Sequence, residues 1–462
     1  MYPHNVVSPP YSTSPFSSAR PACHPPQVSK LDNGVRVATE SQPWTSTATV
    51  AVTIDTGSRF EDVATNGVAH MLEHLNFKGT KRFTRHQIET AVENAGGQLN
   101  AFTSREHTCF TIKAERAAIP PLLEVLSDML TSSNIEPAAV ENERGVILEE
   151  MSHVYQQPNE VVFDHLHSTA FQQTPLGFTI LGPTNNIRSI TADQMKAFRD
   201  KHYTGPRVVV SGAGAITHDE LTSLAKVNFG HLAANGPSTA SLVAGAPAHF
   251  TGSEVRIRDP DSKETHFAVA VEGCANDDPD YLTLEVMRVM LGEWSTEYST
   301  GMHSGSHLAQ KVAAAGLGDR FFAFNTTYHD TGLFGIYASG PSDTTKDLAW
   351  AVMRYMNMLC YDNHVSELDL NRAKAMLKAE RFGLYKNNES VAVDMGAQLA
   401  RYGRRITMDE TLGRIDAITV DDVNRVAKRF LYDTEVAISA FGETRALPEY
   451  QWFRRRTFQL RY

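Results

Sequence analysis

The sequence predicts an α+β fold of two tandem, homologous domains, each a mostly antiparallel sheet covered by helices, which together enclose a cleft. A chain of 462 residues is too long for one ordinary hydrophobic core. Strand-like and helix-like segments are mixed in an α+β order within each half. The second half also repeats patterns of the first, which indicates a duplicated domain.

The repeat is visible in two pairs of segments, each recurring about 225 residues later. The following segments correspond: 101–102 and 110–114 with 323–324 and 334–338, and 190–193 and 208–211 with 418–421 and 436–439. Because several segments keep a similar offset, two halves of like topology are more probable than coincidence.

The first half opens with a hairpin and an alternating strand. Asn33-Gly34 predicts a tight turn. In Thr47–Ile54 the even positions are apolar and three of the four odd positions are threonine, which predicts a strand with one apolar face. Gly57 ends this strand, and a helix carrying a histidine motif follows.

Helices and strands fill the rest of the first half. We expect four helices: residues 85–95, residues 120–130, the charged segment 141–150, and a segment capped by Thr191. We expect strands at 99–104, 109–114 and 207–212. These elements define an N-terminal domain over residues 28–232, which contains the histidine motif. Residues 1–27, rich in serine and proline, predict a disordered or targeting tail.

The second half keeps the topology without the histidine motif. Residues 233–262, with their Asn-Gly-Pro-Ser and Gly-Ala-Pro sequences, predict a linker, and residues 263–462 a homologous C-terminal domain without metal ligands. A strand at 266–271 precedes a helix at 281–291 that has no His-x-x-Glu-His, and Lys378 corresponds to Glu150 of the first half. One half would carry the chemistry and the other would form a scaffold or substrate wall.

Composition excludes some classes of protein. The net charge of −10 argues against nucleic acid as a partner and is compatible with a cationic ligand. No apolar run approaches the length of a membrane span, so we expect no transmembrane segment. Four widely spaced cysteines form no Cys-x-x-Cys pair, which indicates a reducing compartment and no thiolate metal site.

His70-Met71-Leu72-Glu73-His74 is the motif that carries chemistry. On a helix, His70 and His74 lie one turn apart on one face and can bind a single Zn²⁺, which leaves open positions for water and a third ligand. Glu73 would lie near the water without binding the metal. The order is that of the inverted zincins, which take their third ligand from elsewhere in the chain.

The charged helix at 141–150 offers that ligand. Glu143 and Glu150 are seven residues apart, so two helical turns place them on one face. Glu150 could bind the metal, and Glu143 could orient a ligating histidine. The alternative is that these side chains only hydrogen-bond one another in the core, since the motif helix is otherwise apolar and unpaired polar groups there would be costly.

The sequence resembles the pitrilysin-type zinc peptidases, and within them the β-type mitochondrial processing peptidase subunits and the similar core 1 proteins of the cytochrome bc1 complex. The match covers nearly the whole chain after about residue 28. It is carried by residues 67–80 (GVAHMLEHLNFKGT), 99–107 (LNAFTSREH) and 452–458 (WFRRRTF).

The resemblance implies a role for each site residue. His70, His74 and Glu150 would bind one Zn²⁺, Glu73 would be the general base and Glu143 a supporting carboxylate. Phe77 would line the pocket for the substrate residue that follows the scissile bond. Asn100, Ala101 and Phe102 would form the edge strand on which the substrate lies. Glu160 and Asp164 would bind a substrate arginine. Without the resemblance, Glu160 and Asp164 would be interpreted as a solvated helix face.

Two departures from the family pattern stand out. Gly145 and Glu149 replace residues more usual in the helix with the third ligand. Residues 300–305 lack the fuller glycine-rich loop of α-type subunits, which supports a β-type chain that needs an α-type or core 2 partner. For stabilising the oxyanion, Tyr328 and His303 are candidates by residue type only.

The function implied is endoproteolysis of cationic, arginine-containing presequences of imported precursors, at the matrix face of the mitochondrial inner membrane or in the matrix. The chain would also be a core subunit of the bc1 complex, in contact with its other subunits. Two alternatives remain open: a non-catalytic structural core subunit, and a self-sufficient soluble peptidase that acts without a partner.

Overall fold

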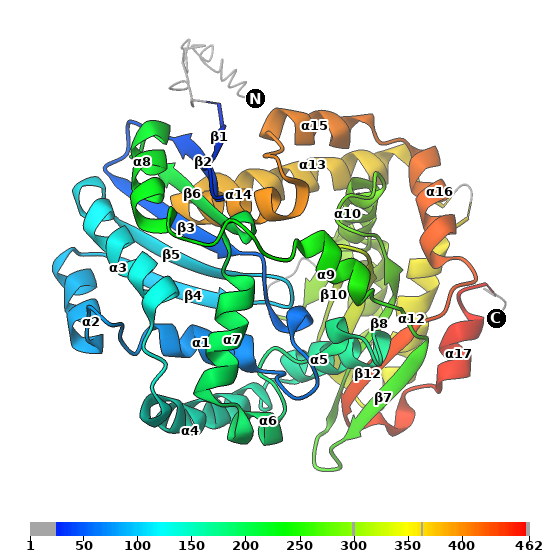
Figure 1. Ribbon diagram of the computed structural model, residues 1–462. Helices are drawn as coiled ribbons and strands as arrows, with labels where there is room; N and C mark the ends of the chain where they lie inside the picture. Colours follow the sequence, from blue (N-terminus) through cyan, green and yellow to red (C-terminus); the bar gives the residue numbers. More distant parts are fainter. Residues whose placement is uncertain (1–24, 298–300, 362–363, 459–462) are drawn as a thin grey trace, which may run out of the picture.

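Two six-stranded sheets, one in each half of the chain, form the centre of the computed structural model (Figure 1). It describes residues 25–297, 301–361 and 364–458. The predicted tail therefore lies outside the described residues except for its last three, and Gln27 already begins a strand. The α+β fold of two tandem, helix-covered sheets is confirmed.

The first sheet has the strand order β1-β2-β6-β3-β5-β4 and is antiparallel except where β2 runs parallel to β6. Its strands are β1 (Gln27–Lys30), β2 (Arg36–Ser41), β3 (Thr47–Ile54), β4 (Gln98–Thr103), β5 (Thr108–Glu115) and β6 (Val208–Gly214). The hairpin predicted at Asn33-Gly34 joins β1 to β2, with Gly34 at a φ of 94° that favours glycine. Because β4 is an edge strand, one side of its backbone is free of sheet partners.

Helices of the first half cover one face of this sheet, where the apolar even positions of β3 lie in the core. The helices of the first half are α1 (Val68–Asn76), α2 (Arg85–Asn94), α3 (Ile119–Ser132), α4 (Pro137–Val154), α5 (Pro158–Ala170), α6 (Thr184–Ser189), α7 (Ala192–His202) and α8 (His218–Phe229). Thr191 caps α7 as predicted, in a capping box with Gln194.

The second sheet repeats the first, with the order β7-β12-β8-β11-β10-β9 and one parallel pair, β7 with β12. Its strands are β7 (Ser253–Arg258), β8 (Glu264–Gly273), β9 (Glu293–Ser295), β10 (Arg320–Thr327), β11 (Gly332–Pro341) and β12 (Ala437–Gly442). The helices of this half are α10 (Tyr281–Leu291), α11 (His307–Ala315), α12 (Thr345–Met358), α13 (Glu367–Gly383), α14 (Asn388–Tyr402), α15 (Met408–Ala417), α16 (Val420–Leu431) and α17 (Tyr450–Arg455).

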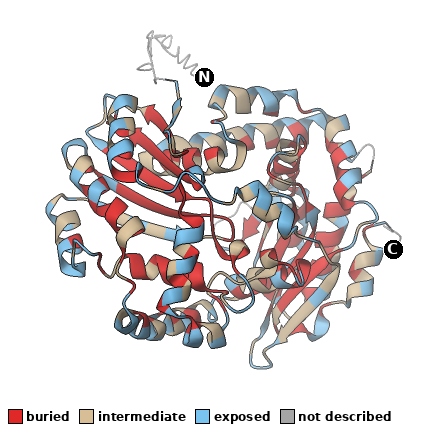
Figure 2. Ribbon diagram, viewed as in Figure 1, coloured by how far each residue is buried: buried red, intermediate tan, exposed pale blue. Residues whose placement is uncertain are grey.

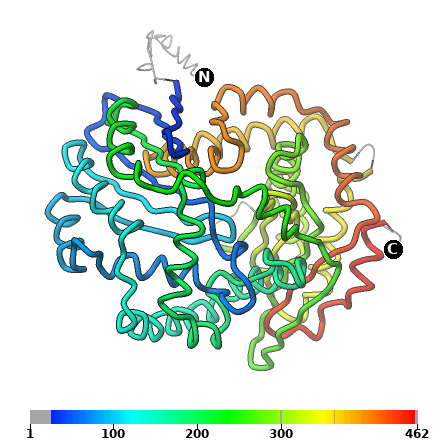
Figure 3. The backbone as a smooth tube through the Cα atoms, in the orientation of Figure 1, coloured from blue at the N-terminus to red at the C-terminus, as the bar shows by residue number. Residues whose placement is uncertain are grey.

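The predicted linker needs a correction. Residues 233–262 contain α9 (Thr239–Gly245) and also β7, which pairs with β12 along its whole length. The second sheet therefore begins at Ser253, inside the range assigned to the linker. The segment that connects the two halves is therefore shorter than the predicted linker. Figure 3 shows it as the green tube that joins them. The strand was missed because it is short and Gly-Ala-Pro lies close before it, although Glu254–Arg258 alternates polar and apolar residues.

The two halves exchange one helix each. Helix α5 packs on the second sheet, where Val162 and Leu166 lie in one cluster with Ala268 and Ala437. Helix α14 packs on the first sheet, where Val391 lies against small residues of its strands. Figure 1 shows the teal-green α5 beside β12 and the orange α14 beside β3 and β6.

Because of this exchange both sheets are covered on both faces. Central strands such as β6 and β11 are buried almost throughout, whereas the outer strands β1, β4 and β7 are partly exposed (Figure 2). The threonine-rich face of β3 is therefore buried too, under α14. None of the helices in the described ranges combines the length and the apolar character that a membrane crossing requires. Three described cysteines, Cys109, Cys274 and Cys360, are buried and unpaired.

Candidate active site

Helix α1 brings the histidine motif into the first half and is fixed at its start by a buried carboxylate. Glu61 accepts hydrogen bonds from the backbone N–H groups of Gly67 and Ala69, at 2.8 and 2.7 Å, and from the Asn66 amide. These contacts satisfy donors that a helix N-terminus leaves free. Gly67 has a φ of 104°, and a side chain there would meet the backbone of Gly182. Burial raises the pKa of Glu61 to about 7.

His70, His74 and Glu150 converge as predicted. The Glu150 Oε2 atom, on α4, lies 3.8 Å from His70 Nε2 and 3.4 Å from His74 Nε2. One ligand atom from each residue fits within 4.8 Å of the others. Ligands about 2.0–2.1 Å from a tetrahedral Zn²⁺ lie roughly 3.4 Å apart, so this donor set fits a metal ion without rearrangement of the backbone.

Glu143, about two helical turns before Glu150 on α4, supports the cluster. It accepts a hydrogen bond from His74 Nδ1 at 2.9 Å and forms an ion pair with Lys78 Nζ at 2.8 Å. This contact leaves His74 Nε2 directed at Glu150, which is the orientation a metal ligand needs. Burial alone would lower the pKa of His74, but the carboxylates of Glu150 and Glu143 raise it.

Glu73 lies beside the two histidines on the same helix and is 9% exposed. Its Oε2 atom accepts a hydrogen bond from the hydroxyl of Thr103, the last residue of β4. Burial raises the pKa of Glu73, and the Thr103 hydrogen bond opposes this shift. A carboxylate that is held but not ion-paired can accept and return a proton. Thr103 was not among the predicted site residues.

A cavity of about 370 Å³ opens at this cluster. His70, Glu73 and Glu150 line it, and so do four predicted substrate contacts, Ala101, Phe102, Glu160 and Asp164. The cavity thus joins the candidate metal site, the edge strand β4 and the helix α5.

Two predicted substrate residues lie outside the cavity lining. Asn100 is an exposed residue of β4 whose side chain accepts a hydrogen bond from the Ala101 backbone N–H. Phe77 ends α1 and packs near Phe110, with ring centroids 6.1 Å apart, and against the cluster of Ile88 and Met129. Phe102 is 42% exposed and remains available to a ligand.

Glu160 and Asp164 differ in their surroundings. Asp164 accepts an ion pair from Arg105 at 2.8 Å, and the Arg105 side chain is only 10% exposed. Glu160 has one hydrogen bond, from the Asn159 amide at 3.2 Å, and no ion pair among the described residues. The two carboxylates are therefore not equivalent. A cationic ligand can pair directly with Glu160, whereas at Asp164 it must compete with Arg105.

The turn between β4 and β5 is fixed by charged side chains that the sequence analysis did not single out. Glu106 accepts an ion pair from Arg59 at 2.7 Å, lies 2.9 Å from His329 Nδ1 and accepts the His329 backbone N–H at 3.0 Å. Arg59 also pairs with Asp330 at 2.6 Å. These contacts join the first sheet to the loop between β10 and β11 of the second half. No local pattern predicts them, because the partners lie far apart in the sequence.

Neither residue considered for oxyanion stabilisation lines the cavity. Tyr328 is buried, and its hydroxyl lies 2.7 Å from His167 Nε2 between α5 and the second sheet. His303 is exposed on a short helix, Gly301–His303. Tyr328 thus has a core role and His303 a surface position.

Comparisons with known proteins agree with this arrangement. The sequence model described as "Insulinase (Peptidase family M16)" matches residues 36–184, and "Peptidase M16 inactive domain" matches residues 189–377. The first match contains all the ligand candidates, and the second contains none.

Similar proteins extend over almost the whole chain. A probable mitochondrial-processing peptidase subunit beta of Arabidopsis thaliana is 47% identical over 94% of this chain and 82% of its own length. The mitochondrial-processing peptidase β subunits of Blastocladiella emersonii and Homo sapiens are 44% and 40% identical, over 94% and 93% of this chain and 92% and 86% of their own lengths.

A solved structure shares the fold. A chain of complex III2 from Candida albicans, with Inz-5 bound, superposes with a TM-score of 0.84 at 24% identity, covering 94% of this chain and all of that one. The sequence matches, together with the His70, His74 and Glu150 cluster beside Glu73, place the protein: the chain belongs to peptidase family M16, the insulinase family.

Proposed function

We propose that the chain is the catalytic β-type subunit of a mitochondrial processing peptidase, a zinc metalloendopeptidase that removes arginine-containing presequences from imported precursors. The observation that carries the proposal is the complete set of His70, His74, Glu150 and Glu73 at one cavity. The relatives at 40–47% identity bear that name. We place the protein in mitochondria, on the matrix side.

One Zn²⁺ per chain would be held by His70, His74 and Glu150. When bound, it lowers the pKa of water and polarises the scissile carbonyl. Glu73 takes the proton from the attacking water and returns it to the leaving amine nitrogen. Thr103 holds the Glu73 carboxylate, and Glu143 holds His74.

The substrate adds as a strand along the free edge of β4, at Asn100, Ala101 and Phe102, through backbone hydrogen bonds that tolerate varied side chains. The pocket for the residue after the scissile bond is assigned to Phe77. Glu160 receives a substrate guanidinium directly. Asp164 does so only by sharing with, or releasing, Arg105.

The test consists of three measurements on the purified native assembly. Metal analysis finds about one zinc per chain, which is lost when His70 or His74 becomes alanine. Glu73→Gln keeps the metal and stops cleavage of a presequence peptide. Full activity in that variant would refute the assignment of the base. Raising the salt concentration weakens peptide binding if carboxylates recognise it, whereas salt-insensitive binding argues for apolar recognition.

We also propose a second role, on the basis of a structural likeness. The structure superposes on the whole length of a chain from complex III2. The protein then also serves as a core subunit of the respiratory bc1 complex, with an α-type or core 2 chain as its partner and the other complex subunits around it. The mass of the native assembly separates a soluble heterodimer from the respiratory complex. Activity of the isolated chain would instead favour a self-sufficient peptidase.

A further inference from the structure

A second cavity, of about 800 Å³, lies away from the candidate active site and shares no lining residue with it. Its wall is built by α10, α13, α14, α15 and the loop that precedes α10. Since α14 also covers the first sheet, the wall lies where the two halves meet. The cavity has the size of a small-molecule site.

Arg401 differs from the other arginines of this cavity, which the carboxylates of Asp277, Asp278 and Asp394 also line. Four other arginines line the wall, and each has an ion-pair partner: Arg381 with Glu285, Arg404 and Arg414 with Glu410, and Arg405 with Glu40. Arg401 has no carboxylate within ion-pair distance among the described residues. Its Nη2 donates to His107 Nε2 at 3.1 Å, and its buried Nε has no hydrogen-bond partner.

His107 does not compensate the guanidinium. Burial and the nearby charge of Arg401 lower the pKa of His107 to about 3, so the imidazole is neutral at physiological pH. It accepts one hydrogen bond and carries no negative charge. The guanidinium therefore keeps its net charge, and its Nε has no hydrogen-bond partner among the described residues.

Asn276 also lines this cavity, with its side-chain amide buried in the wall. The residue is 5% exposed, and neither its side-chain nitrogen nor its side-chain oxygen has a partner among the described residues. Buried amides are nearly always hydrogen-bonded, so an unpaired one in a cavity wall points to a ligand. Its own backbone N–H is used, donating to the Tyr328 carbonyl at 2.8 Å.

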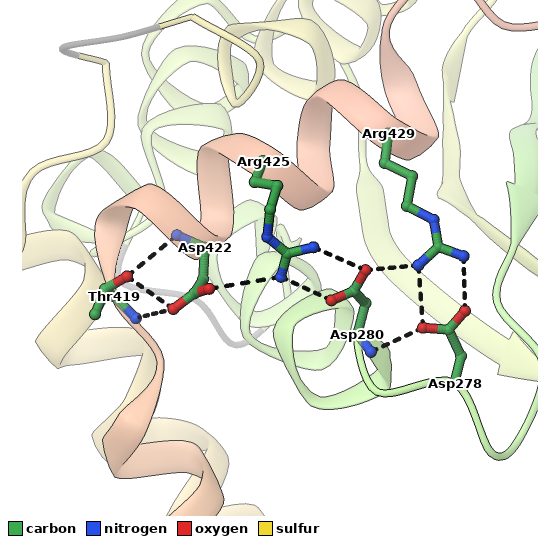
Figure 4. A network of polar contacts seen from close by, with 6 residues as sticks. All are labelled: Asp278, Asp280, Thr419, Asp422, Arg425 and Arg429. Carbon is green, nitrogen blue, oxygen red and sulfur yellow. Dashed lines mark hydrogen bonds and ion pairs between the residues drawn. The ribbon is translucent and has the colours of Figure 1, made fainter.

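The loop that carries Asn276 is held in place by ion pairs with α16, although its Asp278 also lines the cavity. Asp278 and Asp280 accept ion pairs from Arg425 and Arg429 of α16, at 2.6 to 2.8 Å, as Figure 4 shows. Asp278 also accepts the Asp280 backbone N–H. The Asn276 amide is thus presented on a braced loop rather than on a free one.

Tyr402 adds a third donor. Its side chain lines the cavity next to Arg401 on α14, and its hydroxyl has no hydrogen bond to any described residue. Burial raises the pKa of Tyr402, so its hydroxyl keeps its proton and can donate. A guanidinium, an amide and a phenol together form a donor set for an oxyanion.

We propose that this cavity binds the phosphate or carboxylate group of a small anionic molecule through Arg401, Asn276 and Tyr402. The planar guanidinium pairs with two oxygens, and the amide and phenol donate to the remaining lone pairs. The site does not require peptidase activity or the metal ligands. Because its wall joins both halves, occupancy also stabilises their contact.

The test is isothermal titration calorimetry on the full chain in its native assembly, purified without phosphate. Inorganic phosphate is one titrant and malonate the other, with chloride holding the ionic strength constant. We expect saturable binding of at least one of them; the stronger titrant identifies the group. Arg401→Gln weakens binding by about tenfold or more, the loss expected for one charge-assisted pair.

Arg404→Gln is the matched control, because Arg404 is an exposed arginine on the same wall that already pairs with Glu410. It leaves the affinity unchanged. If Arg401→Gln does not fold, Tyr402→Phe removes a single donor and must still weaken binding. Crystals soaked in tungstate should show an anomalous peak beside Arg401. Absence of saturable binding by both anions, or equal affinities in the Arg401 and Arg404 variants, would overturn the proposal.

Discussion

Replacing Thr103 by valine tests whether the edge strand positions the general base. Valine has nearly the same shape as threonine but cannot donate the hydrogen bond that Glu73 accepts. In Thr103→Val the Glu73 carboxylate keeps its place on α1 and loses its only side-chain donor among the described residues. Cleavage should therefore slow while the metal site stays intact.

The magnitude follows from the burial of the pair. Glu73 is 9% exposed, so water replaces the lost donor poorly. A hydrogen bond to a charged group contributes about 1.5–3 kcal/mol. If the bond orients the carboxylate for proton transfer, kcat falls roughly 10- to 150-fold. KM changes little, because Thr103 does not belong to the residues assigned to substrate contact.

The assay is steady-state cleavage of a fluorogenic presequence peptide by the native assembly, with metal content measured on the same samples. Thr103→Ser restores the hydroxyl and should recover most of kcat. A Thr103→Val enzyme with normal metal content and kcat within twofold of the parent would refute the positioning role. Loss of metal in that variant would show instead that the strand supports the ligand cluster.

Three further predictions concern the support of the site and the fold. Glu143→Gln weakens metal affinity by roughly 10- to 100-fold, measured by competition with a chelator, because His74 loses the carboxylate that orients it. Met395→Ala lowers the free energy of unfolding by about 2–5 kcal/mol in urea denaturation, whereas Met376→Ala, at a 48% exposed position, changes it little. Contacts with His329 and Arg59 overcome the effect of burial and lower the pKa of Glu106 to about 2. This contribution to stability is present above the unfolded pKa of about 4.5 and is lost as pH falls toward the folded value, so unfolding free energy drops more steeply between about pH 5 and pH 3 in the parent than in Glu106→Gln.

The local part of the site was predictable because it depends on helix geometry. His70 and His74 are one turn apart, so a helical assignment alone places them on one face. Glu143 and Glu150 share a face of α4 for the same reason. The sequence offered Glu150 as a candidate ligand but could not show that α4 crosses α1 where Glu150 meets both imidazoles; the family resemblance implied that arrangement.

The contacts that were missed join segments distant in the sequence. Thr103 reaches Glu73 because β4 passes beside α1, and Arg105 reaches Asp164 because α5 lies across the end of β4. Threonine and arginine in a strand and its turn have many ordinary roles. The Arg105 pair matters most, since it shows that Asp164 is already engaged, which residue type alone cannot reveal.

The helix exchange left a weak signal in the composition of β3. Its second face carries Thr49, Ala51 and Thr53, which are small enough for a helix to approach closely. Gly396 of α14 lies there, and a Cβ at this position would collide with the Thr53 hydroxyl. The Ser211 hydroxyl donates to the Ala392 carbonyl at 2.7 Å. A glycine within a predicted helix and hydroxyls on a strand fit many structures, so the pairing needed coordinates.

The exchange also explains how a half without metal ligands shapes the site. Helix α5 carries Glu160 and Asp164 on the side that lines the active-site cavity. Its Phe163 packs on the second sheet, 4.9 Å from Phe324 between ring centroids and stacked on Tyr337 at 5.9 Å. Because the aromatic anchor and the two carboxylates share one rigid helix, the second sheet sets where the carboxylates stand relative to His70. The second half thus acts on recognition through α5, although it supplies none of the groups proposed to bind the metal.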